Sequence, residues 1–397
     1  MKIKSIIIGV GALLASVAAS FAQAPQQIES VIVSGKDSAW YAQQADAWDR
    51  EVRKTPQSEH AWRNLFEAKW YLHNWFRVKP EVTDSSQLVI KRMERAIPGS
   101  FTYNLCRLRM QMSTANEYGE RALDMVPDEL HPMHVGTLIS YMWFAGYAES
   151  DNDRSALLNQ LLRRQYEAGY YPDFALRFSY NQLEAMPSGA IYIGHGDLDL
   201  FPKLMMQRAM GLHADKTLIV NSFIHNKAYA DKVCEGLGIK PYEGFKEAYK
   251  DEKDASEAEA GFIRHIAREP GRPVYCGAGV DRNVESLARN IYSEGIVFKY
   301  SEKPYNNVAA TKKALEHKYH LEYLTEPKFR AETYWKGSEM LQVNYVVGLA
   351  HLVRSYREEG NLVRANWLYA TLRASLENTR LPEDVKRQYI GYLDSQK

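Results

Sequence analysis

The stretch AIYIGHGDLDLFPKLM, residues 190–205, decides how the middle of this chain folds. Its first part, Ala190–Gly194, is a short apolar run of the kind that forms a buried strand. A glycine-rich loop with one histidine and two aspartates follows, and Phe201–Leu212 then has helical spacing. A strand that runs directly into a helix predicts one unit of a parallel sheet covered by helices.

The same alternation continues for about a hundred residues. Further β-rich runs are Thr217–Ser222, Pro273–Gly277 and Ile296–Tyr300, and further helical patterns are Asn226–Leu237 and Arg282–Ser293. Together these predict a small parallel sheet of about four strands. The charged, alanine-rich segment Tyr249–Gly261 interrupts the pattern, and we interpret it as a solvated helix or mobile insertion rather than a binding patch.

Both flanks of this region have the spacing of tetratricopeptide-like helical hairpins. In the N-terminal flank the pattern is Trp48, Val52, Pro56, Trp62, Leu65, Ala68 and Tyr71, and a second hairpin is expected over His134–Glu149 and Asp153–Glu167. In the C-terminal flank it is Leu349, Leu352, Tyr356, Gly360, Ala365 and Tyr369. The expected fold is therefore α/β with mostly α flanks. Its divisions are a signal peptide (1–22), a helical-hairpin region (23–186), an α/β domain (187–305) and a C-terminal helical region (306–397).

The first residues have the pattern of a cleavable secretory signal. Lys2 and Lys4 precede the apolar run Ile6–Phe21, and Ser20 with Ala22 favours cleavage before Gln23. No cysteine follows the run, so a lipoprotein anchor is not expected. The mature protein is expected to be soluble, periplasmic or secreted, and without a membrane span.

Charge and cysteine content exclude several classes of protein. The chain has 50 basic and 49 acidic residues, and residues 1–22 hold two lysines and no acid, which leaves 48 against 49. This balance gives no general attraction to nucleic acid. Three scattered cysteines support neither a disulfide framework nor a cysteine-based zinc site.

The loop after the first strand holds the candidate catalytic residues His195, Asp197 and Asp199, with Gly196 as a candidate ligand-binding residue. Loops at the carboxyl ends of parallel strands line the ligand crevice of such sheets, and two carboxylates there can act as acid and base or bind a hard cation. The structural alternative is that Asp199 caps a helix opening at Leu200–Phe201, while Asp197 bonds turn amides. Pro202 in the first helical turn favours this alternative.

Two other loops supply the remaining candidate ligand-binding residues: Asn221, His225, Gly277, Gly279 and Arg282. Glycines ahead of a helix, with an arginine, can hold a phosphate on backbone amides. Arg282 stands where a dinucleotide fingerprint needs its third glycine, so no cofactor is expected. Cys276 is interpreted as a buried core thiol. The pairs His131/His134 and His317/His320 resemble half of a metal site, but lack a third ligand, and no metal is expected.

The segment YNQLEAMPSGAIYIGHGDLDLFP, residues 180–202, resembles the soluble C-terminal part of bacterial protein O-mannosyltransferase-like membrane proteins, with their Gly-Asp-x-Asp-x-aromatic-Pro turn. KTLIVNSFIH, RPVYCGAGV and EGIVFKYSEKP also fit, so the resemblance spans roughly residues 181–366. Its most specific residues are Gly196, Asp197, Asp199, Phe201 and Pro202. The family's membrane-embedded transferase half is missing, and Leu198 and Leu200 replace polar residues. The resemblance implies a related soluble domain and carries no transferase activity onto this chain.

With no complete catalytic set visible, the leading expectation is a non-catalytic, exported interaction or scaffold protein that binds a protein partner through helical-repeat surfaces. The alternative is a periplasmic enzyme or ligand-binding protein for a sugar, glycan or phosphorylated group at the His195–Asp199 loop, possibly linked to protein glycosylation. Whether the chain is an enzyme stays open at this point, with the balance against it.

Overall fold

The structure is a computed structural model that describes residues 24–79, 85–147, 153–246, 248–268, 271–280, 285–325 and 338–397. These described residues form two compact units, one within residues 1–112 and 116–128, the other within residues 113–115 and 129–397. At Asp197, Glu285 and residues 338–340 the side chains lie outside the described part. Among the described residues, no helix combines the length and the apolar composition needed to cross a bilayer.

The first unit is made of short helices packed as hairpins. They are α1 (Val31–Ser34), α2 (Ser38–Lys54), α3 (Glu59–Trp70), the π-helical turn η1 (Tyr71–Trp75), α4 (Ser86–Ala96), α5 (Phe101–Met110) and α6 (Glu117–Asp124). The side chains of Asp37, Ser58, Ser85, Ser100 and Asn116 each accept a backbone amide at a helix start. The α2–α3 pair is the hairpin that the tryptophan-rich spacing predicts.

The second unit contains the sheet, which has the strand order β2-β1-β3-β5-β4. Its strands are β1 (Ile191–Gly194), β2 (Thr217–Val220), β3 (Val274–Cys276), β4 (Ile291–Glu294) and β5 (Val297–Tyr300). The central strand β1 is parallel to both β2 and β3, whereas β5 is antiparallel to β3 and β4. Ile191, Tyr192 and Ile193 are completely buried, as expected of a strand covered on both faces.

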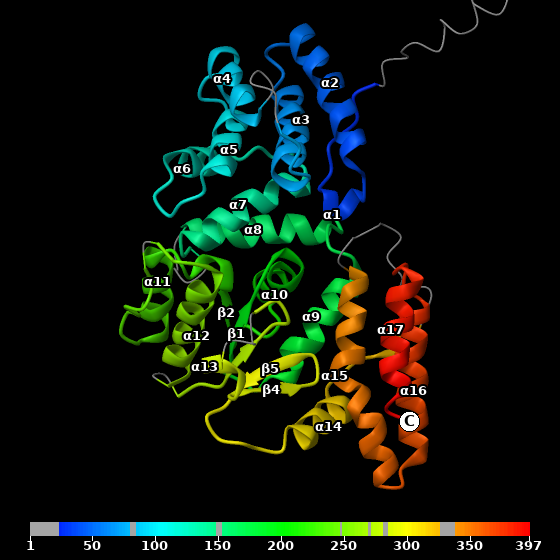
Figure 1. Cartoon of the computed structure of the whole chain (residues 1–397). Coiled ribbons are helices and arrows are strands. Elements are labelled where there is room, and N and C mark those ends of the chain that lie inside the picture. The colour runs from blue at the N-terminus through cyan, green and yellow to red at the C-terminus, as the bar shows by residue number, and fades with distance from the viewer. Residues whose placement is uncertain are drawn as a thin grey trace, which may run out of the picture. The chain divides into compact units, whose positions relative to one another are not determined.

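Helices cover this sheet. They precede its strands in the sequence, lie between them and follow them. Before it come α7 (Pro132–Phe144), α8 (Asp153–Glu167) and α9 (Asp173–Ala185). Between its strands lie α10 (Asp197–Ala209), η2 (Asn221–Phe223), α11 (Lys227–Leu237), α12 (Glu252–Arg268) and α13 (Glu285–Ala288). After it follow α14 (Asn307–His317), η3 (Glu322–Leu324), α15 (Ser338–Glu358), α16 (Leu362–Glu377) and α17 (Glu383–Asp394), the last three side by side (Figure 1). The expected fold class, α/β with mostly helical flanks, is confirmed.

Two details of the predicted sheet are wrong. The helix expected over 282–293 ends early, because Ile291–Glu294 forms β4, a fifth strand. Only β2, β1 and β3 are parallel, since β4 and β5 form a hairpin joined by two residues. The first residue of that turn, Gly295, has φ +73°, a conformation that tight hairpin turns require and that glycine adopts without strain.

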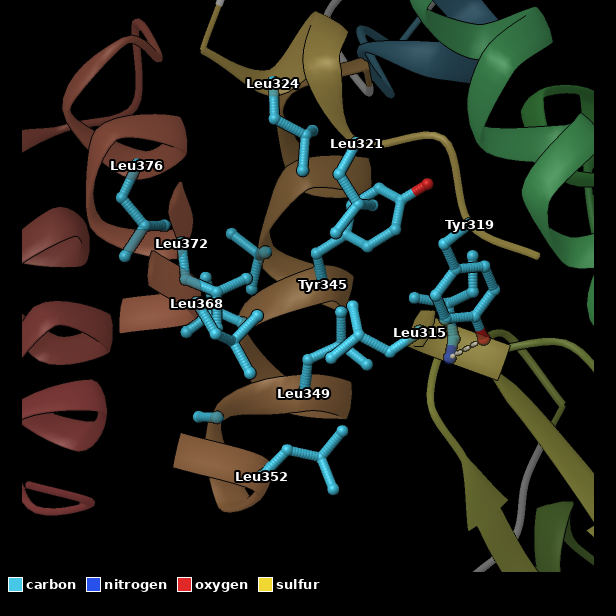
Figure 2. Close-up of a cluster of buried hydrophobic side chains, with 14 of the residues drawn as sticks. Leu315, Tyr319, Leu321, Leu324, Tyr345, Leu349, Leu352, Leu368, Leu372 and Leu376 are labelled. Carbon is cyan, nitrogen blue, oxygen red and sulfur yellow. Dashed lines mark hydrogen bonds between the residues drawn. The ribbon is translucent and has the colours of Figure 1, made fainter. Parts of the chain in front are cut away.

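The C-terminal helices share one buried core with the sheet's edge (Figure 2). Leu349 and Leu352 of α15 and Leu368, Leu372 and Leu376 of α16 all belong to this core and are completely buried. Gly360 (φ +77°) lies in the turn between these helices, and Ala365 is completely buried in the same core. The tetratricopeptide-like spacing of this region therefore predicted a real helical hairpin.

Another glycine, Gly348, marks where α15 touches the β4–β5 turn. A Cβ atom added at Gly348 would lie 2.3 Å from the carbonyl oxygen of Gly295. We therefore predict that Gly348→Ala lowers the free energy of unfolding by about 1–3 kcal/mol, because backbone atoms on both sides must move. Urea denaturation followed by circular dichroism measures this change.

The matched control is Gly391→Ala in α17. That position is also inside a helix, and an added Cβ meets no atom within 4 Å. Since alanine is the better helix former, this substitution should raise stability by roughly 0.5–1 kcal/mol. Equal effects of the two substitutions would contradict the close contact between α15 and the hairpin turn.

Candidate functional site at the carboxyl ends of the parallel strands

The loops that follow β1, β2 and β3 lie at one edge of the sheet, because these three strands are parallel neighbours. The loops after β1 and β3 touch directly. The amide of Gly277 donates to the Ile193 carbonyl at 2.8 Å, and a Cβ at Gly279 would lie 3.0 Å from the Cβ of His195. His195 and Gly196 are exposed at this edge.

The Asp199 carboxylate is held inside the fold. One oxygen, Oδ1, accepts from the Tyr192 hydroxyl at 2.6 Å and from the Lys203 ammonium at 2.8 Å. The other, Oδ2, accepts from the His195 backbone amide at 3.0 Å. Gly277 packs against this carboxylate so closely that a Cβ there would lie 2.3 Å from Oδ2. Asp199 therefore joins β1, the loop and α10.

Lys203, the partner of Asp199 one helical turn later, is completely buried. Its ammonium also donates to the Gln182 side chain at 2.6 Å. Burial lowers the pKa of Lys203, and the charge and hydrogen bonds of Asp199 raise it again. Burial, reinforced by Asp199, holds the pKa of Tyr192 well above its ordinary value, so Tyr192 stays a hydrogen-bond donor.

The start of α10 differs from the predicted helix start. The helix begins at Asp197, after Gly196 in the N-cap position with φ +81°. Asp199 is consequently the third helical residue, and it accepts the amide of His195, one residue before the N-cap, where a capping box would use the N-cap amide itself. The expectations that Asp199 is the N-cap and that Pro202 lies in the first turn are both wrong, since Pro202 lies in the second turn.

The residues that follow β2 form a second cluster with α12. His225 Nε2 lies 2.7 Å from Glu259 Oε1, and its Nδ1 lies 3.1 Å from the Tyr249 hydroxyl. The Asn221 side chain donates to Glu259 Oε2 at 2.8 Å, which fixes the orientation of its amide. The buried Asn221 Oδ1 has no hydrogen-bond partner among the described residues.

Sequence reasoning missed Glu259 and Tyr249, because both come from the segment interpreted as solvated and not as a binding patch. That interpretation is corrected in part. Glu259 stands three, four and seven residues before Phe262, Ile263 and Ile266, which are all completely buried. A carboxylate on the apolar face of a helix, such as that of Glu259, indicates that a hydrogen-bond partner lies beside it inside the fold.

This arrangement contains no activated nucleophile among the described residues. Both ring nitrogens of His225 are engaged, and the Asp199 oxygens are bonded to Tyr192, Lys203 and His195. Cys276 is completely buried. Two of the candidate site residues, Arg282 and the Asp197 side chain, lie outside the described part.

One histidine of each predicted pair makes a hydrogen bond within the fold. His131 accepts the Met133 amide at the start of α7, and the backbone amide of His320 donates to Asn181. Throughout the described residues, no group of three or more His, Cys, Asp or Glu side chains is arranged to hold a metal ion.

We predict that Asp199→Asn lowers the free energy of unfolding by about 3–5 kcal/mol, because the buried Lys203 ammonium loses its counter-charge. Lys203→Met in the same chain should recover most of that loss, since it removes the uncompensated charge while keeping an unbranched side chain. Urea denaturation at neutral pH of the single and double variants measures both effects. A double variant less stable than Asp199→Asn alone would show that the pair is not the reason Asp199 is needed.

No protein-family model matches this chain, and no curated protein or solved structure gives a significant match to it. The resemblance of residues 181–366 to the O-mannosyltransferase-like family therefore stays an expectation from the sequence.

Proposed function

We propose that this chain is an exported, non-catalytic interaction protein of the bacterial cell envelope that binds an apolar segment of a partner polypeptide. The observation that carries the proposal is a groove of about 370 Å³ between helices of the second unit. It is lined by Tyr166 of α8, by Asp173, Leu176, Arg177, Tyr180 and Asn181 of α9, by Met206 of α10 and Met210 just after it, and by Leu212 and His320.

The lining of this groove suits apolar side chains. Met210 and Tyr166 are 37% and 41% exposed, which is high for residues of this size. Methionine adapts its shape to different partners, and tyrosine offers a rigid apolar face at a low entropy cost. The α8–α9 wall comes from the region whose spacing predicts helical hairpins, where a partner surface is expected.

Hydrogen bonds of Asn181, a residue that lines the groove, hold the helix α9 in position. Asn181 donates to the Tyr345 hydroxyl at 2.6 Å and to the His320 carbonyl at 2.9 Å, and it accepts the His320 amide at 2.9 Å. These bonds tie α9 to α15 and to the segment before η3. On α9 the Asp173 carboxylate and Arg177 guanidinium are 2.6 Å apart, one helical turn from each other. A preformed groove of this kind lowers the ordering cost of binding.

Chemistry at the carboxyl edge is the weaker alternative. A periplasmic enzyme or ligand-binding protein for a sugar or phosphorylated group, linked to protein glycosylation, would use the His195–Asp199 loop. The buried Asn221 Oδ1 favours this alternative, because a ligand hydroxyl would supply its missing donor. Against it stands the full engagement of Asp199 and His225 within the fold.

Export is proposed from the N-terminal sequence. The basic and apolar pattern of residues 2–21 supports it, and that segment lies outside the described residues. The near-neutral charge of the rest of the chain fits a protein that does not bind nucleic acid.

We predict that peptides selected from a phage-displayed random library on the full chain will be rich in leucine, methionine and aromatic residues. Met210→Glu should weaken the binding of a selected synthetic peptide at least about tenfold, because it places a charge in the apolar groove. Fluorescence anisotropy with the labelled peptide measures the affinity.

Tyr392→Glu is the control, since Tyr392 is 40% exposed on α17 and lies outside the groove. It should leave peptide affinity unchanged. Selection of no peptide, or equal losses in the two variants, would reject the groove as the binding surface.

A further inference from the structure

A second cavity, of about 500 Å³, lies at the amino end of β2. Its lining residues come from α7, α8, α10 and β2 with the residues just before it: Trp143, Asn159, Leu204, Gln207, Arg208, Ala214, Lys216, Thr217 and Leu218. It is at the opposite end of β2 from the loop that holds Asn221 and His225. The cavity is within the size range of small-molecule sites.

The cavity lies on a different face of α10 from the peptide groove. Leu204, Gln207 and Arg208 line the cavity, whereas Met206 and Met210 line the groove. Residues spaced three and four apart share one side of a helix, so these two sets point in different directions. A ligand in the cavity therefore does not occupy the groove.

Among the residues that the structure describes, the charged ones that line the cavity are Arg208 and Lys216. A third cation, Arg272, donates to the Thr217 hydroxyl at 2.8 Å, and Thr217 is a lining residue. Lys216 is paired with Asp215, whose carboxylate is 3.2 Å from the Lys216 ammonium and also accepts the Gly189 amide. Lys216 is only 8% exposed, which strengthens its attraction for an anion.

The edge of β2 adds a backbone donor. The Thr217 amide donates to Ala190, so the alternation of a parallel ladder turns the Leu218 amide toward the free edge of the sheet. Leu218 lines the cavity at that edge. The next amide on the same side, that of Val220, is 3.1 Å from the Tyr229 hydroxyl and is therefore occupied.

Two amide side chains complete the polar lining. Gln207 donates to the carbonyls of His213 and Lys216, both at 2.9 Å, and so fixes the segment that carries Lys216. The Asn159 Oδ1 atom is buried and has no hydrogen-bond partner among the described residues. Such an acceptor is satisfied by a donor, and a sugar hydroxyl is one.

From this combination we infer that the cavity binds a small anionic sugar. Its phosphate or carboxylate group lies against Lys216, Arg208 and the Leu218 amide. One of its ring hydroxyls donates to Asn159 Oδ1, and the ring carbons face Leu204 and Leu218. A neutral sugar lacks the group that the basic residues hold.

The test is isothermal titration calorimetry of the full chain at low ionic strength with glucose 6-phosphate, glucuronate and glucose as probes. Binding of glucose 6-phosphate or glucuronate, with no binding of glucose, is expected, and the better of the two anions identifies phosphate or carboxylate as the preferred group. Lys216→Met should weaken that binding at least about tenfold. Binding of neither anion at 10 mM, or equal binding of glucose, would overturn the inference.

Asp215→Asn is a second variant that distinguishes loss of the site from loss of folding, because we expect it to raise the affinity for the anion. Removing the acid paired with Lys216 should strengthen binding of the anion, while the asparagine oxygen still accepts the Gly189 amide. Unfolding cannot produce tighter binding. Weaker or unchanged binding in Asp215→Asn would contradict a site built around Lys216, and Met210→Glu should leave anion binding unchanged whatever happens to peptide binding.

Discussion

A buried ammonium next to a carboxylate is the constraint on which the α/β part of this protein depends. Lys203 is completely buried, and its charge is matched by Asp199 at 2.8 Å. The same pair reaches Tyr192 on β1, the amide of His195 in the loop, and Gln182 on α9. Gln182 in turn donates to the Ile296 carbonyl in the β4–β5 turn at 3.0 Å. One ion pair therefore links five segments, and an unpaired charge in that place would be costly.

This constraint gives the acidic residue Asp199, at the end of a strand, a part in holding the fold together. The residue types at 195–199 suit acid–base chemistry, and the position after β1 is where ligands bind in many parallel sheets. The Asp199 carboxylate lies so close to Gly194 and Gly277 that neither position has space for a Cβ atom. The backbone of both segments therefore packs directly against this carboxylate. The groove and the cavity that remain available are built instead by helices α7 to α10 and by β2.

Local patterns allowed the helical hairpins and the strands β1, β2, β3 and β5 to be predicted. Gly360 and the apolar spacing around it specify α15 and α16 within one short segment, and β1 to β3 each stand out as apolar runs. The strand β4 was missed because its short run follows a helix-like pattern, and only pairing with β5 reveals it. Glu259 was missed as a site residue because its partners, Asn221 and His225, are more than thirty residues away. The partner of Asp199 is a lysine only four residues later, but the burial of that lysine is a tertiary property.

Asp199, Lys203 and Met206 lie on one side of α10, and Met210 follows at the end of this helix. This row of residues begins in the buried ion pair and ends at a methionine on the surface of the groove. The central claim, that the Asp199 carboxylate serves the fold, is tested most directly by the hydrogen-exchange rate of the His195 amide, measured by nuclear magnetic resonance. His195 is an exposed loop residue, yet its amide donates to Asp199, so exchange should be slowed about a hundredfold or more relative to an unstructured peptide. Exchange at the unprotected rate would mean that Asp199 is free to face solvent or a ligand, and would contradict the account.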